Sequence, residues 1–346
     1  MNFSQHLSRR KFIRLASGAI ISMSAFSLMG CSNNHNGETS ANSSTKTNLN
    51  DTNNKAKVFF TDDISPQGLI KVYDQIKSNL TGNIAIKLHT GEVHGPNLLP
   101  IDLIKNLQAN IPNSTIVECN VLYSSPRQNT DTHRQVIETN GFTFCPVDIM
   151  DADGDISLPV PSIQERINNG TITNPEEHIT QVPVGAHLTN YNSMLVYTHF
   201  KGHAMGGFGG SLKNIGIGVA SRYGKEVVHG KGWPTGKTFL ERMVESGYAI
   251  INHFGNQIAY INVLKNMSVD CDCDAHGAKP TCSDIGILAS TDILAIDQAS
   301  IDLVYKLPSN ENRDLIQRIE SREGLHQLEY MAELGMGNRN YDLIQI

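Results

Sequence analysis

Cysteine and histidine side chains gather within twelve residues of the C-terminal half of the chain. Cys271 and Cys273 are separated by one residue, and His276 and Cys282 follow on a turn-rich, acidic segment. Thiolates with one imidazole suit tetrahedral Zn²⁺, and three thiolates with one further ligand can hold an iron-sulfur cluster. We expect these four residues to bind a metal ion or an iron-sulfur cluster. The spacing does not choose between Fe and Zn, and a disulfide from Cys282 to Cys271 or Cys273 is the alternative.

A second group of reactive side chains follows an apolar run. Lys87 and His89 fall on one face of a strand expected over residues 83–89, because side chains alternate with a period of two. Glu92 comes on the turn that follows, so a cation, a general acid and a general base lie within a few residues. We expect Lys87, His89 and Glu92 to act on a substrate. A salt-bridged strand end is the alternative.

A glycine-rich segment leads from a strand into a helix. Glycines let the backbone approach a ligand closely, and backbone N–H groups at a helix start, with two lysines, suit an anion such as phosphate or carboxylate. The residues expected to bind this anion or a cofactor are Lys201, Gly207, Gly209, Gly210, Lys213 and Asn214. His203 is expected to transfer protons. The segment has neither the P-loop nor the dinucleotide-binding pattern, and a tight crossing that needs small residues is the alternative.

Two further residues are candidates for supporting roles. Asp297 lies on an otherwise apolar helix, where a carboxylate needs a partner. We expect Asp297 and His199 to orient a histidine or a metal ligand by hydrogen bonds, without touching the metal themselves. A helix cap or a buried salt bridge is the alternative for Asp297.

Alternating strands and helices must position these groups. Strands are expected over 57–61, 83–89, 114–118, 193–200, 257–264, 286–290 and 341–346, and helices over 66–79, 101–110, 131–140, 210–221, 235–246, 292–305, 311–321 and 326–334. Residues 151–185 are rich in Asp, Gly, Pro and Asn and are expected to be irregular. This order predicts an α/β fold with a mixed, largely parallel sheet flanked by helices. Functional groups in such sheets tend to lie beyond the carboxyl ends of the strands.

The N-terminus resembles an export signal. Arg9 and Arg10 precede the uncharged segment 15–29, which ends in a lipobox-like sequence before Cys31. The apolar run is shorter than the roughly 20 residues that span a bilayer. We expect residues 1–31 to be a twin-arginine lipoprotein signal, with Cys31 lipidated and the protein held at the periplasmic or outer cell surface. Because that route carries folded proteins, it favours a cofactor that is bound before export.

The remaining chain divides into a tether and one domain. Residues 32–55 are dominated by Asn, Ser and Thr and are expected to be disordered, whereas 56–346 can form one sizeable α/β domain. The chain has 28 basic and 34 acidic residues, and four of the basic ones belong to the signal. This balance disfavours a nucleic-acid partner, and we expect membrane contact only through the lipid.

The motifs together resemble a known family. The segments around Lys87, His199, Cys271 and Asp297 are similar to those of the bacterial and archaeal "uncharacterised Fe-S centre proteins", and the resemblance covers nearly all of residues 56–346. Many of these proteins carry a ferredoxin-like insert with two cysteine runs, which is missing here around 224–236. The resemblance therefore implies a shared core site but not the clusters of the insert, and it supplies no reaction.

The leading hypothesis is an exported lipoprotein with redox activity on a small anionic substrate. A thiolate-bound centre would exchange electrons with an electron-transfer partner, the lysines would hold the substrate, and His89 or His203 with Glu92 would transfer protons. A non-catalytic lipoprotein that binds a metal or an anion, and a zinc-dependent hydrolase, are the alternatives.

Overall fold

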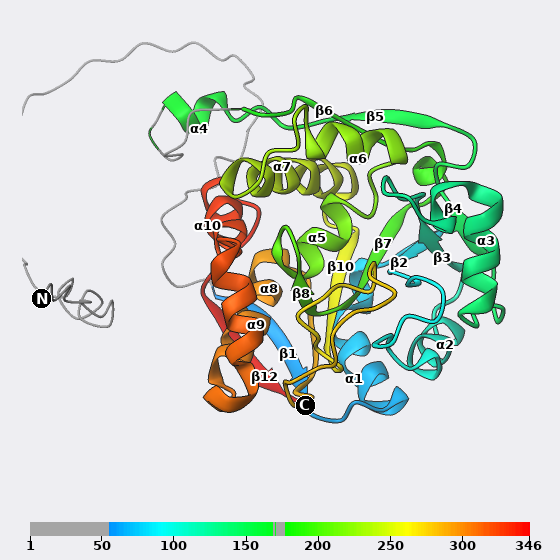
Figure 1. The fold of residues 1–346 in the computed structure, drawn as a ribbon, viewed down its shortest axis with the longest axis vertical. Helices are drawn as coiled ribbons and strands as arrows, with labels where there is room; N and C mark the ends of the chain where they lie inside the picture. The colour runs from blue at the N-terminus through cyan, green and yellow to red at the C-terminus, as the bar shows by residue number, and fades with distance from the viewer. Residues whose placement is uncertain (1–54, 169, 171–176) are drawn as a thin grey trace, which may run out of the picture. The chain divides into compact units, whose positions relative to one another are not determined.

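A mixed sheet forms the centre of the domain (Figure 1). The computed structural model describes residues 55–168, 170 and 177–346. Within these residues eight strands form the main sheet, in the order β12 (Tyr341–Gln345), β1 (Ala56–Thr61), β11 (Gly286–Ser290), β10 (Ile258–Leu264), β7 (Ser193–His199), β2 (Ile84–Lys87), β3 (Ser114–Glu118) and β4 (Val147–Ile149). Of these strands, β11 runs antiparallel to both of its neighbours and the others are parallel. The predicted fold class is confirmed.

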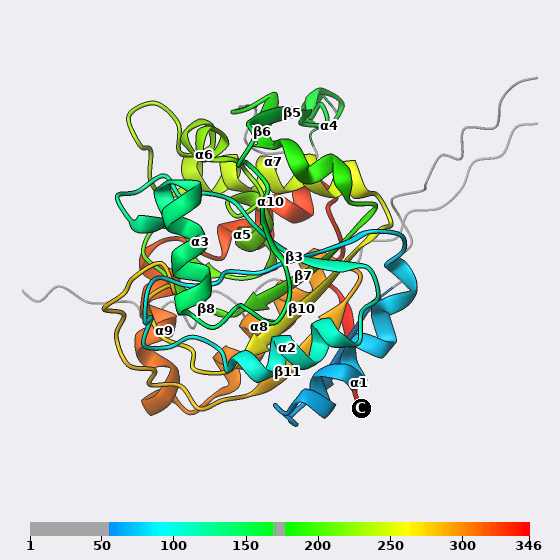
Figure 2. The same cartoon turned by 90° about the vertical axis from the view of Figure 1, so that its right-hand side faces the viewer.

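Helices cover both faces of the sheet, which is why the central strands β7 and β10 are buried along their whole length. Helices α1 (Pro66–Ile76) and α2 (Ile101–Ala109) pack on one face through a cluster that includes Leu69, Leu107 and Ile86. Helices α5 (Ser211–Gly216), α7 (Lys237–Phe254) and α8 (Ile293–Lys306) pack on the other. Figure 2 shows α1 and α2 on one side of β7 and β10, with α5 and α7 on the other.

Local sequence signals explain where the flanking helices begin. Ser65 caps α1 by accepting a hydrogen bond from the Gly68 amide, and Pro66 occupies the first turn, where its missing N–H is harmless. Asp292 caps α8 by accepting from the Ala295 amide at 2.8 Å. Both helices therefore start where the sequence predicts.

The topology brings two of the chemically interesting segments together. From β2 the chain proceeds outward to β3, whereas from β7 it proceeds to β10 in the opposite direction, although β2 and β7 are neighbours. Connections that leave adjacent parallel strands in opposite directions open a crevice at their carboxyl ends. Lys87 ends β2 and His199 ends β7, so both lie at this crevice.

Some elements differ from expectation. The segment expected to be irregular contains the antiparallel pair β5 (Asp155–Pro159) and β6 (Gln181–Gly185), as well as α4 (Gln164–Asn168). The glycine-rich turn forms a hairpin of β8 (Lys201–His203) and β9 (Gly207–Gly209). Helix α5 ends at Gly216, earlier than expected, and α6 (Arg222–His229) was not expected. The other described helices are α3 (Thr130–Thr139), α9 (Ser309–Ser321) and α10 (His326–Glu333), together with the 3-10 helices Lys77–Asn79, Pro126–Gln128 and Ala186–Asn190.

The expectations for the N-terminus lie almost entirely outside the described residues. The export signal, Cys31 and the tether belong to residues 1–55, of which the structure describes Lys55 alone. No helix among the described residues combines the length and the hydropathy needed to cross a bilayer.

Candidate functional site

The cysteine pair lies on the loop between β10 and β11. The Cys271 sulfur accepts hydrogen bonds from the Lys213 ammonium at 3.5 Å and from the Cys273 amide at 3.4 Å. A hydrogen bond from the Cys273 thiol and the nearby lysines lower the pKa of Cys271 well below that of an ordinary thiol, and the pKa of Cys273 is raised in turn. The pair therefore favours one thiolate and one thiol.

His203 joins this pair from a distant part of the chain. One of its ring nitrogens and the two sulfurs all lie within 4.8 Å of one another, in a grouping suited to a metal ion. Among the described residues no other cluster of three or more such side chains is as close. Two thiolates with one imidazole leave a fourth tetrahedral position open, as in catalytic rather than structural zinc sites.

The other two expected ligands lie elsewhere. The Cys282 sulfur is buried 3.6 Å from the Glu311 carbonyl oxygen, and His276 is exposed. The structure therefore groups Cys271 and Cys273 with His203 in place of the expected four-residue set on one loop. All five described cysteines are free, so the alternative disulfide to Cys282 is not formed either.

The ring of His203 sets a condition on metal binding. Its Nδ1 accepts a hydrogen bond from the Gly206 amide at 2.9 Å, and burial with Lys213 nearby lowers its pKa well below the ordinary range. The neutral ring then carries its proton on Nε2. A ligating nitrogen must be bare, so His203 fits a metal only after it moves this proton or breaks the bond to Gly206. The two cysteines fit a soft metal ion without such a change.

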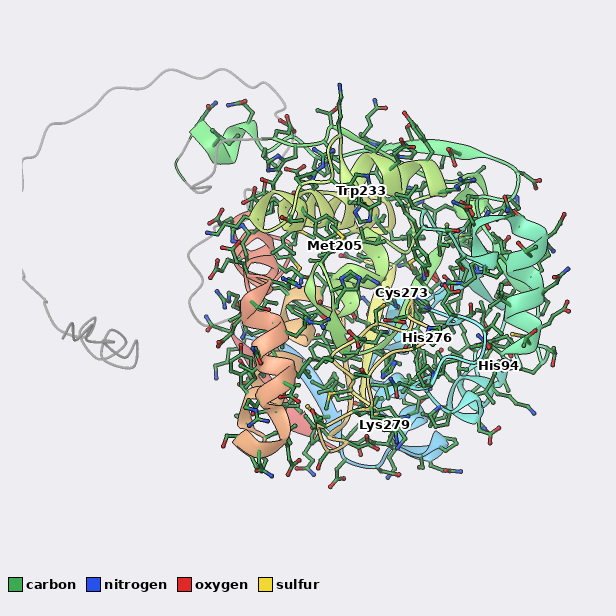
Figure 3. All side chains as sticks on the ribbon, viewed as in Figure 1. His94, Met205, Trp233, Cys273, His276 and Lys279 are labelled. Carbon is green, nitrogen blue, oxygen red and sulfur yellow. The ribbon has the colours of Figure 1, made fainter. Side chains whose placement is uncertain are left out.

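A cavity of about 270 Å³ opens beside the cysteine pair. Cys273 and His203 belong to its lining, and so do four cations. These cations are Lys87, Arg127, Lys213 and Lys225. In the view of Figure 3, Trp233, Met205 and Cys273, which all line the cavity, follow one another down the face of the domain. The three groups of residues predicted separately thus meet at one cavity.

A buried ion-pair network crosses the end of β2 and β3. The Lys87 ammonium lies 3.3 Å from one oxygen of Glu118, and Arg127 donates to the other at 2.9 Å. Burial lowers the pKa of Lys87. Although burial alone would raise it, the pKa of Glu118 is held at about 2 by Lys87 and Arg127. Glu118 is therefore ionised and fixes both cations at the cavity wall.

Glu92 is held by donors on every side. Its carboxylate accepts hydrogen bonds from the Tyr123 hydroxyl at 2.6 Å, the Ser125 hydroxyl at 2.7 Å and Arg127 at 3.3 Å. These three donors hold the Glu92 carboxylate in one position. His89 faces Arg127 through Nε2 and accepts from the Gly91 amide through Nδ1, and burial with Arg127 nearby lowers its pKa well below the ordinary range. The geometry gives these two expected catalytic residues positioning contacts.

The backbone amides expected to bind an anion already bind a carboxylate of the protein itself. The Ser211 and Leu212 amides at the start of α5 donate to the Asp297 carboxylate at 2.8 and 2.9 Å. A Cβ at Gly210 would lie 2.5 Å from an Asp297 oxygen, so this glycine makes room for the carboxylate. Burial raises the pKa of Asp297 to about 6. Asp297 therefore supports the glycine-rich turn and not a histidine or a metal ligand, and its helix-capping alternative describes it best.

Asn214 and Gly207 also have internal roles. Asn214 accepts from the Lys87 ammonium at 3.2 Å and donates to the Tyr197 carbonyl at 3.1 Å, so it ties α5 to β2 and β7. Gly207 has a positive φ of 79°, and Gly209 pairs with Lys201 in the hairpin. These residues shape the turn that carries Lys213 to the cysteines.

Asp272 fixes the loop between the two cysteines. Its carboxylate accepts from His199 Nδ1 at 2.9 Å and from the Lys201 ammonium at 2.9 Å. Burial alone would raise it, but these two partners lower the pKa of Asp272 below its ordinary value. Lys201, expected to hold an anionic ligand, instead pairs with this internal carboxylate. His199 contacts the cysteine loop through Asp272.

Several cavity residues were missed in the sequence. Arg127 comes from the 3-10 helix Pro126–Gln128 and is almost fully buried, while Lys225 comes from α6. Glu118 ends a correctly predicted strand, and its place at a carboxyl end was a usable signal. Arg127 and Lys225 stand in no pattern that marks them as buried.

The fold and the Cys/His group define an α/β domain with a candidate metal site beside a cation-lined cavity. Residues 84–302 match the family described as "Domain of unknown function (DUF362)". This match covers more than half of the chain, and the protein belongs to that family.

The solved structures that match this chain do so only distantly. The lactate racemase apoprotein from Thermoanaerobacterium thermosaccharolyticum is 10% identical with a TM-score of 0.40, covering 71% of this chain and 56% of that one. A protein from Thermotoga maritima is 10% identical with a TM-score of 0.36, covering 76% of this chain and 60% of that one. The chain thus spans less than two thirds of either structure. Among curated proteins none matches this sequence.

Proposed function

We propose that this protein is an oxidoreductase that binds a small anionic substrate in the cavity, next to a metal ion or iron-sulfur cluster held by Cys271 and Cys273. The observation that carries the proposal is the shared wall: Cys273 and His203 line the same cavity as Lys87, Arg127 and Lys213. A soft-metal site and a site for negative charge therefore adjoin each other.

The charges around the cavity favour an anion. Three of its four cations contact an anionic group, namely Glu118, Glu92 or the Cys271 thiolate, whereas the Lys225 ammonium contacts a carbonyl oxygen. An excess charge in buried surroundings is unfavourable unless it is paired. A bound monoanion would supply that pairing, and it would lie beside the cysteines.

A thiolate-bound metal or cluster would supply electron transfer when bound. The chain's own residues would bind and orient the substrate through the cations of the lining. In its neutral form His203 carries a proton on Nε2, so this atom can donate a hydrogen bond to the substrate. Asp272 would keep the cysteine loop in place by its bonds to His199 and Lys201.

We also propose that the protein acts outside the cytoplasm. The twin-arginine signal and the lipidated Cys31 that the sequence predicts would place a domain folded with its metal at the periplasmic or outer surface. Electrons would then pass to or from an electron-transfer partner there.

Metal analysis of three cysteine variants tests this function. The protein is produced in the cytoplasm, purified without oxygen, and analysed for iron, zinc and sulfide together with its visible absorption. Cys271→Ala and Cys273→Ala should each lose the metal, whereas Cys282→Ala should keep it because its sulfur lies outside the group. Iron with a visible chromophore supports the redox function. Unchanged metal content in a Cys271→Ala/Cys273→Ala double variant would refute it, and zinc would favour a hydrolase.

One observation favours a second function, the capture of a metal ion or an anion without catalysis. Glu92, the expected general base, accepts hydrogen bonds from three donors, and Lys201 forms an ion pair with Asp272. A binding protein needs no free base, so these paired groups suit it. Absence of substrate turnover by metal-loaded, reducible protein would favour this function.

A further inference from the structure

Helix α6 contributes a wall of the cavity that the sequence did not predict. Lys225 and His229 are four residues apart on this helix, so they lie on one face, and both line the cavity. Trp233 and Phe239, which follow α6, line it as well. This stretch supplies a cation and three aromatic rings to the lining.

Lys225 differs from the other cavity cations in its partners. Lys87 and Arg127 pair with Glu118, and Lys213 donates to Cys271. Lys225 is only 5% exposed, and its ammonium donates to the Ala220 carbonyl oxygen at 2.6 Å. In the described part of the chain it forms no ion pair with a carboxylate within 4.0 Å. Burial lowers the pKa of Lys225, and Asp151 and Glu118 act on its charge from a greater distance. Among the described cations of the cavity, Lys225 is thus the one whose ammonium has no anionic group in contact.

The remaining surface of the cavity is largely apolar. The His229 ring stacks on Phe239 at a centroid distance of 5.0 Å and lies 4.4 Å from the Trp233 ring, tilted by 33°. Val121, Leu122, Met205 and Ile217 are among the other apolar residues of the lining. Trp233 is 53% exposed and Tyr123 39% exposed, although both line the cavity. Two aromatic rings thus stand where the cavity meets solvent.

We propose that the ligand of this cavity is an organic monocarboxylate with a flat apolar body. Its carboxylate pairs with Lys225, and its body packs against the wall of His229, Trp233 and Phe239. This inference rests on the proposed function, because it concerns the same anion site. It adds the chemical class of the substrate. A phosphate or sulfate ion has no apolar part to bury against these rings, and it is too strongly hydrated to gain from them.

Fluorescence titration of the full chain tests this class directly. Trp233 is the only tryptophan in the sequence, so intrinsic tryptophan emission reports on the wall itself. Benzoate, acetate and inorganic phosphate are each titrated into the protein. We expect a saturable change with benzoate and at least ten-fold weaker binding of acetate and phosphate, because only benzoate combines the carboxylate with a flat body. Acetate or phosphate binding as tightly as benzoate, or no saturable response to benzoate, would overturn the proposal.

Variants of α6 test the role of Lys225. Lys225→Met should weaken benzoate binding at least ten-fold, and Lys225→Arg should retain most of the binding. Lys231→Met, at an exposed lysine just after α6, is the control and should leave benzoate binding unchanged. Melting curves check that each variant is folded. If Lys225→Met does not fold, the titrations of the unaltered protein with the three anions decide whether the proposed ligand class is correct. Equal binding by Lys225→Met would overturn the assignment.

Metal content measured on the same samples separates this inference from the proposed redox function. Protein without metal that still binds benzoate through Lys225 would support the ligand class while the redox function fails. Protein that keeps its metal but does not prefer benzoate would leave the redox function standing and refute the proposed ligand class.

Discussion

The carboxylate of Asp272 accepts a hydrogen bond from His199 Nδ1 at 2.9 Å and so ties the cysteine loop to the end of β7. The other ring nitrogen of His199 lies 2.7 Å from the Lys265 carbonyl oxygen, at the start of the same loop. One imidazole thus joins both the start and the middle of the segment that carries Cys271 and Cys273. The geometry of the candidate metal site depends on this contact.

Replacement of Asp272 should therefore loosen the site and the fold together. In Asp272→Asn the buried Lys201 ammonium loses its carboxylate partner, and removal of one member of a buried ion pair costs about 3 kcal/mol. We expect a loss of that order in the free energy of unfolding, measured in urea, and reduced metal content. Asp274→Asn, at an exposed aspartate two residues away, serves as the control. Equal losses in both variants would show that Asp272 has no special role.

Asp297 should make stability depend on pH. Burial raises its pKa from 3.8 to about 6, so the folded state binds the proton more tightly than the unfolded chain. The stabilisation is fully present below the unfolded pKa and is lost as the pH rises through about 6. A shift of this size corresponds to about 3 kcal/mol. Relative to Asp297→Asn, which cannot titrate, the free energy of unfolding of the unaltered protein should fall by that order between about pH 4 and pH 7. A difference that does not vary with pH would contradict the assignment.

Cys271 should be a thiolate at neutral pH in metal-free protein. The Cys273 thiol and the Lys213 ammonium both stabilise its charge, which lowers its pKa below the value of about 8.5 of an ordinary thiol. Ultraviolet thiolate absorption should persist below neutral pH and disappear in Cys271→Ala. Lys213→Met should shift the titration upward, and Lys279→Met, at an exposed lysine on the same loop, should not. A titration that is identical in Lys213→Met would refute the proposed stabilisation.

The regular elements could be predicted because their signals are local. Strands β3 and β11 occupy the predicted residues, since each is a short apolar run between turn-forming residues. Helix α6 was missed because it is only eight residues long and contains Gly224 and the β-branched Val227 and Val228, which are weak helix formers. The pair β5 and β6 was missed because its short strands contain proline and polar residues.

The candidate site was predictable only in pieces. The alternation of strands and helices placed Lys87 and His199 at the carboxyl ends of strands, and the cysteine spacing marked Cys271 and Cys273. The partner of the cysteines could not be found in this way, because His203 reaches them through the tertiary position of a hairpin 68 residues earlier in the chain. Arg127 and Lys225 contradict the general rule that long charged side chains avoid the interior, so composition argued against them.

The direction of β1 has a consequence for how the domain would be presented at a membrane. β1 runs parallel to β2 and β7. Its first residue, Ala56, therefore lies at the amino-terminal ends of these strands, whereas the cysteine loop lies at their carboxyl ends. The preceding chain thus joins the domain at its far end from the cavity mouth. If Cys31 carries the proposed lipid, the mouth with Tyr123 and Trp233 is free to turn toward the surrounding medium, where a soluble substrate or a docking redox protein can approach it without obstruction by the lipid headgroups.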